Sequence, residues 1–344
     1  IALCGSVCDE FPRVWFRPAL MNRQHTEVEV WAEEQFGSAE LGDARRTARL
    51  VRIATRAAEN PSGRLSDVFA SSRELDAAYD FVERENTSVV RLENAVGRAT
   101  ASQCAAQPRV RVAVDGSSVS LHDGTNEKGF GRIGTNAAGA RGLKVISALA
   151  MGADGVPIGL LAQSWWARPD APSRTVTQKR GDARRKTPDE KETRYWLQTI
   201  ELSAERLKAT DALGWFQLDR EADAWPTLLA LSQSGHWFTV RSSWDRLLAA
   251  TGRDKQYLRA HMGAAPAMGS YELEVPARPG RQARTAHMVM RGAEVTLLLR
   301  DKRSDRDHPL RVRVVWTHEK GTTPRGEKPL DWMLLTNAPI GSDD

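Results

Sequence analysis

Two short apolar runs, each followed at once by an aspartate, limit most strongly what this chain can fold into. The run Val110–Val114 leads to Asp115, and the run Leu213–Leu218 leads to Asp219. Runs of this length and composition predict buried strands. Carboxylates placed where strands end are how a protein holds a divalent metal for phosphate chemistry. We therefore expect the chain to bring these two strands together, so that Asp115 and Asp219 bind metal.

The periodicity of the sequence changes near residue 107. Before it, the pattern is helical, with helices expected over about residues 27–36, 43–59, 71–85 and 89–104. Asp43 is a good N-cap, and Ser71 and Glu74 have the spacing of a capping box. Beyond it, strands alternate with helices, which predicts an α/β layer with helices on the faces of a sheet.

These patterns predict three parts of the chain. Residues 1–26 are either a flexible tail or read-through upstream of the true start, since Met21 is the first methionine. Residues 27–106 form a small all-helical domain, and residues 107–344 form the α/β core with a β insertion at about 257–340. Within the core, we expect a turn at residues 115–118 and a polar connecting loop at 170–194.

Composition excludes several classes of protein. The chain of 344 residues is 41% hydrophobic and 27% charged, which is ordinary for a soluble globular protein. No apolar run approaches the roughly 20 residues of a membrane span, so we expect no membrane partner. Three cysteines form no disulfide framework, which fits a reducing cytoplasm, and nothing pairs with Cys4 and Cys8 to complete a zinc site. The net charge of +5 permits an anionic partner without requiring one.

The predicted helix at 43–59 has a basic face. Arg45, Arg49, Arg52 and Arg56 fall at helical spacing, while apolar residues occupy another face. A charged row of this kind is most often a solvated surface. Because almost every charge here has the same sign, the row also matches contact with phosphates or with a DNA major groove.

Seven segments of the chain carry a family resemblance in the same order. They are Leu41–Leu50, Ala78–Val82, Asp115 with the hydroxyl residues after it, Trp165–Asp170, Asp219–Asp223, Phe238–Ser242 and Lys320–Thr336. Together they resemble the IS4 family of cut-and-paste DNA transposases, and most closely its Tn5 transposase branch. The resemblance extends over about residues 28–340.

The resemblance implies an RNase H-like catalytic core in which Asp115, Asp219 and a glutamate hold two Mg²⁺ or Mn²⁺ ions. One ion would activate the attacking water or 3′-hydroxyl, and the other would stabilise the leaving 3′-oxygen. The implied partner is double-stranded DNA at the transposon terminal repeats, bound by a homodimer in the bacterial cytoplasm, in association with the nucleoid.

The resemblance also assigns roles in DNA binding. The helix carrying Arg45, Arg46, Arg49 and Arg52 would read the transposon end, and Arg241 would lie near the bound strand end. Trp332 would be pushed into DNA where a base is flipped. A core tryptophan in a strand is the alternative for Trp332. The acids after Asp219, at positions 221 and 223, are explained as residues at a helix N-terminus.

One departure from the family pattern concerns the third acid. The family carries it as the glutamate of a Tyr-x2-Arg-x3-Glu-x6-Lys signature, which does not follow Trp332–Pro339 in this sequence. The helices that pair two subunits are also not found. We therefore expect a C-terminally truncated copy with impaired catalysis. The alternatives are a non-catalytic DNA-binding protein that inhibits a full-length relative, and a hydrolase of small phosphoesters or sugars, which leaves the arginine row unexplained.

Overall fold

The computed structural model describes residues 26–62, 64–84, 88–122, 127–134, 139–170, 175–249 and 255–340. The predicted tail, apart from Thr26, lies outside these ranges. The chain divides into two compact units, one formed by residues 1–38 and 42–84 and the other by residues 39–41 and 85–344. None of the described helices is long and apolar enough to cross a membrane.

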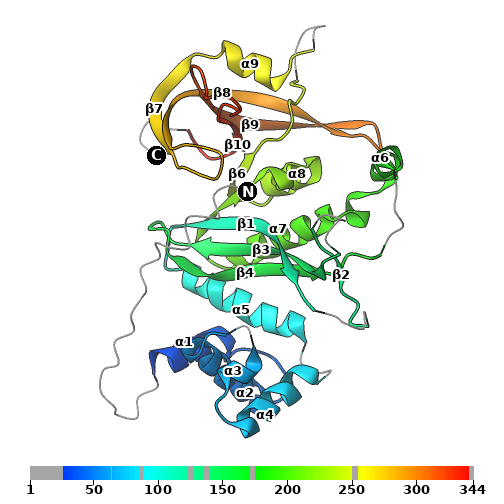
Figure 1. Cartoon of the computed structure of the whole chain (residues 1–344), viewed down its shortest axis with the longest axis vertical. Helices are drawn as coiled ribbons and strands as arrows, with labels where there is room; N and C mark the ends of the chain where they lie inside the picture. Colours follow the sequence, from blue (N-terminus) through cyan, green and yellow to red (C-terminus); the bar gives the residue numbers. More distant parts are fainter. Residues whose placement is uncertain are drawn as a thin grey trace. The chain divides into compact units, whose positions relative to one another are not determined.

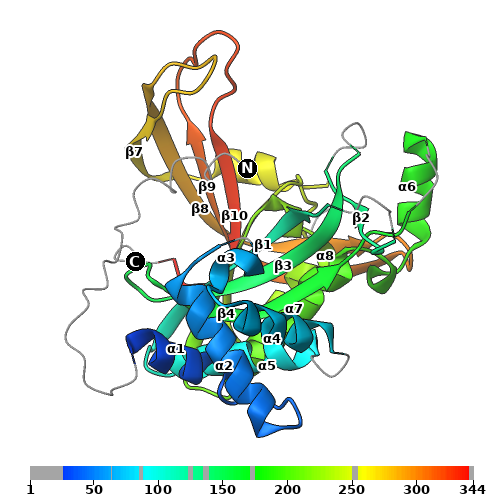
Figure 2. The same ribbon diagram turned by 60° about the horizontal axis from the view of Figure 1, so that its bottom comes forward.

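The first unit is helical, as the sequence predicts. Its helices are α1 (Glu27–Phe36), α2 (Ala44–Glu59), α3 (Leu65–Val68) and α4 (Ser72–Glu83), seen in Figure 2. Asp43 caps α2 by accepting a hydrogen bond from the backbone N–H of Arg45 at 2.9 Å. The capping box predicted at Ser71 is wrong, because the Ser71 side chain makes no capping bond. The Ser71 main-chain carbonyl accepts from the N–H of Leu75 at 3.0 Å, so α4 still begins where expected.

The second unit is built on one mixed sheet (Figure 1). Its strands are β1 (Arg109–Ser120), β2 (Gly131–Arg132), β3 (Arg141–Met151), β4 (Pro157–Trp166), β5 (Leu213–Leu218), β6 (Trp237–Arg241), β7 (Ala267–Val275), β8 (Arg284–Asp301), β9 (Arg306–Glu319) and β10 (Asp331–Thr336). Their order is β2-β3-β1-β5-β6-β10-β9-β8-β7, with β4 paired to β3. β5 runs parallel to β1 and β6, and the other pairs are antiparallel.

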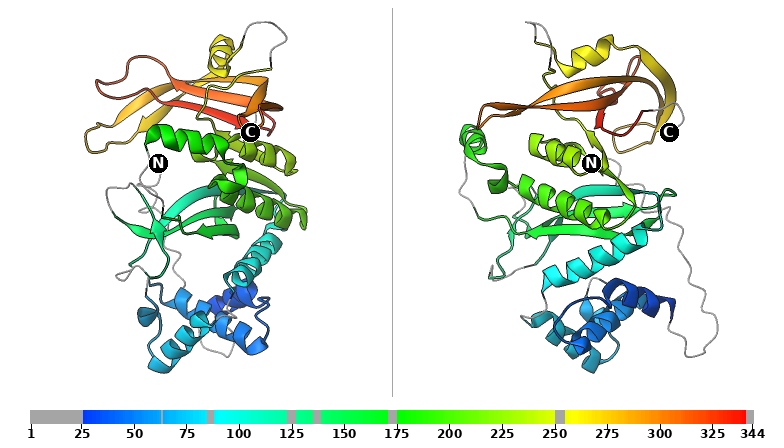
Figure 3. Two further views of the ribbon diagram at one scale, coloured as in Figure 1. Left: turned by 90° about the vertical axis from the view of Figure 1, so that its right-hand side faces the viewer. Right: turned by 180° about the vertical axis from the view of Figure 1, so that it is seen from behind.

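Helices α5 (Val89–Cys104), α7 (Thr193–Lys208), α8 (Trp225–Gln233) and α9 (Leu258–Ala264) pack on strands of this sheet. The unit also contains α6 (Val176–Arg185) and short 3₁₀ turns at Pro188–Glu190 and Arg220–Ala222. α7 and α8 pack against each other (Figure 3), and their buried residues share one core with those of β1, β5 and β6. A helical N-terminal region followed by this α/β sheet confirms the predicted fold class and is compatible with an RNase H-like core.

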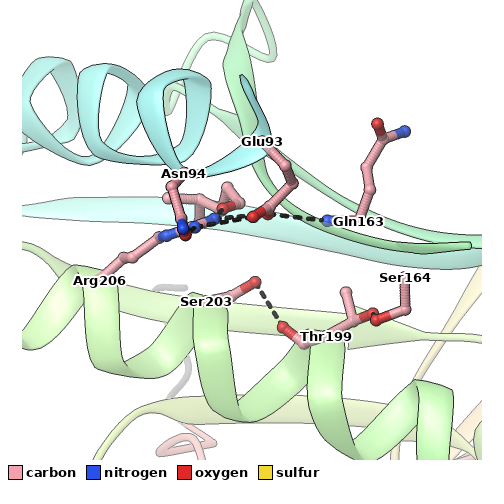
Figure 4. Close-up of polar contacts among 8 residues, drawn as sticks. Glu93, Asn94, Gln163, Ser164, Thr199, Ser203 and Arg206 are labelled. Carbon is pink, nitrogen blue, oxygen red and sulfur yellow. Dashed lines mark hydrogen bonds and ion pairs between the residues drawn. The ribbon is translucent and has the colours of Figure 1, made fainter. Parts of the chain in front are cut away.

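A buried arginine joins α5 to the sheet (Figure 4). Arg206 of α7 is 7% exposed, forms an ion pair with Glu93 of α5 at 2.7 Å, and donates to the carbonyl of Leu161 on β4. A side chain at Gly97 would collide with the Arg206 guanidinium and with the main-chain carbonyl oxygen of Leu161, so α5 needs glycine here. α5 therefore belongs to the second unit, whereas the boundary expected at residue 106 grouped it with the preceding helices.

One further element differs from expectation. The predicted loop at 170–194 contains α6, which starts with a capping box formed by Thr175 and Gln178. In the region of the predicted β insertion, β10 pairs with β6 on one side and β9 on the other. The late strands thereby extend the same sheet that carries β1 and β5.

Candidate active site and DNA-binding surfaces

The sheet brings the two predicted acids together. β1 and β5 are adjacent and parallel, with Val114 opposite Leu218, so Asp115 and Asp219 each follow at the next position. An oxygen of Asp115 accepts from the N–H of Gly116, and an oxygen of Asp219 accepts from the N–H of residue 221, both at 2.7 Å. These bonds fix the orientation of both carboxylates.

The turn predicted at residues 115–118 is wrong. β1 continues to Ser120 because β3 keeps pairing with it, from Asp115 opposite Ser147 to Ser120 opposite Gly142. β5 ends at Leu218, so Asp115 has a strand on one side and the end of β5 on the other. Glycine and serine favour turns locally, but the hydrogen bonds offered by β3 override that preference here.

Asp115 and Asp219 lie close enough for their negative charges to interact. Burial raises the pKa of Asp115, and the negative charge of Asp219 raises it further. Hard carboxylate oxygens that repel one another suit a divalent cation, which would offset both charges. Among the residues that the structure describes, no third histidine, cysteine, aspartate or glutamate completes a group that could hold a metal ion.

Glu221 is close in sequence but is not the missing third acid. Its carboxylate lies 4.0 Å from the place where a Cβ on Gly116 would stand. Successive side chains of a strand point to opposite faces. Glu221 therefore lies on the face opposite to the Asp115 side chain.

Arg241 lies next to Asp219 in the sheet. Val240 of β6 is opposite Leu218, so Arg241 follows in the same row as Asp219. Burial and the nearby charge of Arg220 lower the pKa of Arg241, while Asp219 opposes that effect. The structure thus gathers three of the residues singled out in the sequence: Asp115 on β1, Asp219 directly after β5, and Arg241 at the end of β6.

Trp332 lies two positions from that row on the neighbouring strand, because Leu334 of β10 is opposite Arg241. It is half-buried on β10 and packs with a small apolar cluster formed by Val275, Ala286 and Met288. This packing matches the alternative of a core tryptophan. Contact between Trp332 and DNA stays a prediction.

On α2, the arginines divide into two groups. Arg45 is exposed, and Arg46 and Arg49 are partly exposed. Arg52 and Arg56 line a groove of about 650 Å³ between helices of the first unit, in which α1 and α4 contribute acidic side chains. Arg56 forms an ion pair with Glu59 at 2.9 Å. Because Arg56 is already paired with an acid, Arg45 and Arg49 are better placed than Arg56 for an anionic ligand.

The position expected for Asp223, at a helix N-terminus, is wrong. Asp223 does not start a helix; it follows the 3₁₀ turn, and its side chain is 0% exposed. It accepts from the N–H of Ser243 at 2.6 Å and from the hydroxyl of Ser242 at 3.2 Å, and it forms an ion pair with Arg246. Asp223 thus ties the loop after β6 to the loop that carries Asp219. No sequence signal indicates this pairing, because the partners are 23 residues apart in irregular segments.

The first, helical unit contains most of a segment that matches a known protein family. Residues 28–87 match a family model described as Transposase DNA-binding. The matched family is a DNA-binding domain of transposases. The match covers most of α1 to α4, including the arginines of α2. It supports a DNA-binding transposase and DNA as the partner of this chain.

Proposed function

We propose that this chain is a DNA transposase of the cut-and-paste IS4/Tn5 type. It binds double-stranded DNA at transposon terminal repeats and acts on phosphodiester bonds with the help of divalent metal. The observation that carries the proposal is the placement of Asp115 on β1 next to Asp219, which directly follows the neighbouring parallel strand β5, in a chain whose residues 28–87 match a transposase DNA-binding family.

The proposal assigns DNA binding and metal binding to different residues. Arg45, Arg46, Arg49 and Arg52 of α2 would neutralise DNA phosphates. Arg241 would bind the backbone of the strand end next to Asp219. Asp115 and Asp219 would hold Mg²⁺ or Mn²⁺, with two ions expected when the site is complete. The bound metal would supply Lewis-acid activation and charge neutralisation at the phosphate, which carboxylates alone would repel.

Cleavage by the 344-residue chain is proposed to be weak. Two carboxylates hold a metal less firmly than three, and no third acid joins them in the described part of the chain. The same observation favours a second candidate function, a non-catalytic regulator that occupies transposon ends and inhibits an active transposase. A homodimer and a cytoplasmic location, both implied by the family resemblance, stay predictions.

The test combines binding and cleavage on duplex DNA that carries the terminal repeats flanking the gene. We expect affinity to fall steeply as salt rises, because counterions are released on binding. Nicking in Mg²⁺ or Mn²⁺ should be slight in the wild type and absent in Asp115→Asn and Asp219→Asn. Strong nicking that Asp219→Asn abolishes would disprove the proposed impairment. A flat salt response would disprove both DNA functions.

A further inference from the structure

An exposed tryptophan stands beside the candidate active site. Trp244 follows Arg241 by three residues, in the loop that leaves β6. It is 64% exposed, against 43% for Trp31 and 41% for Trp165, and it is the most exposed tryptophan in the described part of the chain. An exposed aromatic ring next to a candidate site is available for stacking with a ligand.

The loop before Trp244 is held firmly. The N–H of Ser242 donates to the carbonyl of Met333 on β10 at 2.7 Å, and its hydroxyl lies 3.1 Å from the carbonyl oxygen of Trp244, an acceptor that alternates with Asp223. The next residue, Ser243, donates its N–H to the buried carboxylate of Asp223 at 2.6 Å. The backbone that leads to the ring is therefore fixed to two other segments.

The loop after Trp244 is held as well. Asp245 accepts a hydrogen bond from the N–H of Arg259 at the start of α9, at 2.8 Å. Arg246 forms the ion pair with Asp223. The backbone around Trp244 is thus anchored on both sides, although no helix or strand contains it. A ligand that contacts this ring would pay little for ordering the loop.

The charges around the ring indicate which ligand it suits. The hydroxyl of Ser243 donates to the carbonyl of Arg220 at 3.0 Å, so the exposed Arg220 lies next to this loop. The guanidinium of Arg241 is close enough to that of Arg220 for their charges to interact. A tryptophan on a loop that lies next to two arginines suits single-stranded nucleic acid, since bases stack on aromatic rings and phosphates bind cations. An apolar protein surface would not need those cations.

We propose that Trp244 is a stacking platform for an unpaired base of the DNA strand that reaches Asp115 and Asp219. This inference rests on the proposed function, because it places the DNA strand at those acids. Stacking on a ring does not depend on base identity, so Trp244 would favour unpaired over paired DNA without selecting a sequence.

The test compares two probes and four proteins. The probes are a blunt DNA duplex and the same duplex with a single-stranded 3′ tail that carries 2-aminopurine, a base whose fluorescence is quenched by stacking. The proteins are the wild type, Trp244→Ala, Trp244→Phe and Trp165→Ala, the last being the control at another exposed tryptophan. Circular dichroism confirms that each variant is folded.

We expect Trp244→Ala to bind the tailed duplex about 5- to 150-fold more weakly than the wild type. It should also lose the 2-aminopurine quenching and bind the blunt duplex as the wild type does. Trp244→Phe should keep most of the affinity for the tail, and Trp165→Ala should match the wild type on both probes.

Three results would contradict the inference in different ways. If Trp244→Ala binds the tailed duplex as tightly as the wild type, the stacking role is wrong while the proposed function stands. If Trp244→Ala loses affinity equally for both probes, the ring contacts DNA without selecting unpaired bases, and the inference is again wrong. If the wild type binds neither probe in a salt-dependent way, the proposed function fails together with the inference.

Discussion

The ion pair between Asp223 and Arg246 connects the loops that follow β5 and β6. The Asp223 side chain is 0% exposed and that of Arg246 is 11% exposed. The carboxylate also accepts from the N–H of Ser243 and the hydroxyl of Ser242. A buried charge is costly once its partner is removed, because the remaining group keeps its desolvation penalty. Asp223 therefore holds Arg241 and Trp244 near Asp219 without itself lying in the row of site residues.

Replacing Asp223 with alanine should lower the free energy of unfolding by about 3–5 kcal/mol, because Arg246 would be left unpaired. Urea denaturation measures this loss. The double variant Asp223→Ala/Arg246→Met should recover part of it, since no buried charge remains. The control is Arg259→Ala, which breaks the exposed pair with Asp331 and should change stability by less than about 1 kcal/mol. A loss no larger than that of the control would contradict the assigned role.

His236 should make stability depend on pH. It is 7% exposed, its Nδ1 accepts from the N–H of Gly214 at 3.1 Å, and its Nε2 lies 3.3 Å from the carbonyl of Ala204. Burial lowers the pKa of His236, the bond to Ala204 raises it, and the charge of Lys208 lowers it. Protonation of His236 would place a hydrogen on Nδ1, where it would meet the N–H of Gly214 and break that hydrogen bond. The folded protein therefore favours the neutral histidine.

The unfolded chain binds that proton more tightly than the folded protein does. The contribution of His236 to stability is therefore complete above its ordinary pKa of 6.5 and is lost as the pH falls below it. Between about pH 7.5 and pH 5, the wild type should lose more free energy of unfolding than His236→Asn. Thermal unfolding across this range measures the difference, and parallel pH curves for the two proteins would show that His236 does not titrate as described.

At the scale of elements, α2 combines a structural face with a binding face. Leu50, Ala54 and Thr55 are buried, while Arg45 is exposed and Arg49 partly exposed. One helix thus anchors itself in the first unit and presents cations. Arg56 on the same helix is already paired with Glu59 and lies 3.9 Å from Glu74.

Removing charges from α2 should weaken DNA binding in a salt-dependent way. The double variant Arg45→Gln/Arg49→Gln should flatten the plot of log affinity against log salt by about 0.9 for each phosphate that the variant no longer neutralises. The control is Arg56→Gln on the same helix, which should leave that slope close to the wild-type value. Fluorescence anisotropy at several salt concentrations measures both. A larger effect from Arg56→Gln would show that the other side of α2 faces DNA.

Local pattern predicts some elements well and others badly. α1, β5 and the cap at Asp43 follow from nearby residues, because helical periodicity, an apolar run and a capping side chain act over a few positions. The continuation of β1 past Asp115 depends on β3, and the tie between Asp223 and Arg246 depends on two loops meeting. Local pattern thus indicated Asp115 and Asp219, and the family resemblance indicated Arg241, but neither indicated the buried pairing of Asp223 or the exposure of Trp244.

At the scale of the molecule, β10 joins two groups of strands. On one side, β6 leads to β5 and β1, which carry the candidate site. On the other, β9 leads to β8 and β7. β10 pairs with both β6 and β9, so main-chain hydrogen bonds connect the whole sheet through six residues.

A substitution that creates a cavity at β10 should therefore weaken strand pairing both toward β6 and toward β9. Leu335 is 0% exposed, and Leu335→Ala should cost about 2–5 kcal/mol of stability. Hydrogen exchange should become faster in β6 as well as in β9. Leu299→Ala on β8, equally buried, is the control and should speed exchange in β8 and β9 while leaving β6 protected. Unchanged exchange of β6 in Leu335→Ala would contradict the joining role of β10.

The position of β10 also sets the timing of sheet completion during translation. Val240 of β6 pairs with Leu335, which is 335 minus 240, or 95, residues further along the chain. At a synthesis rate of about 5–20 residues per second, β6 waits about 5–20 seconds for that neighbour. Throughout that interval one edge of β6 offers unpaired N–H and C=O groups, the kind of edge on which strands of other chains assemble. The nascent chain thus passes through a seconds-long stage in which aggregation competes with folding.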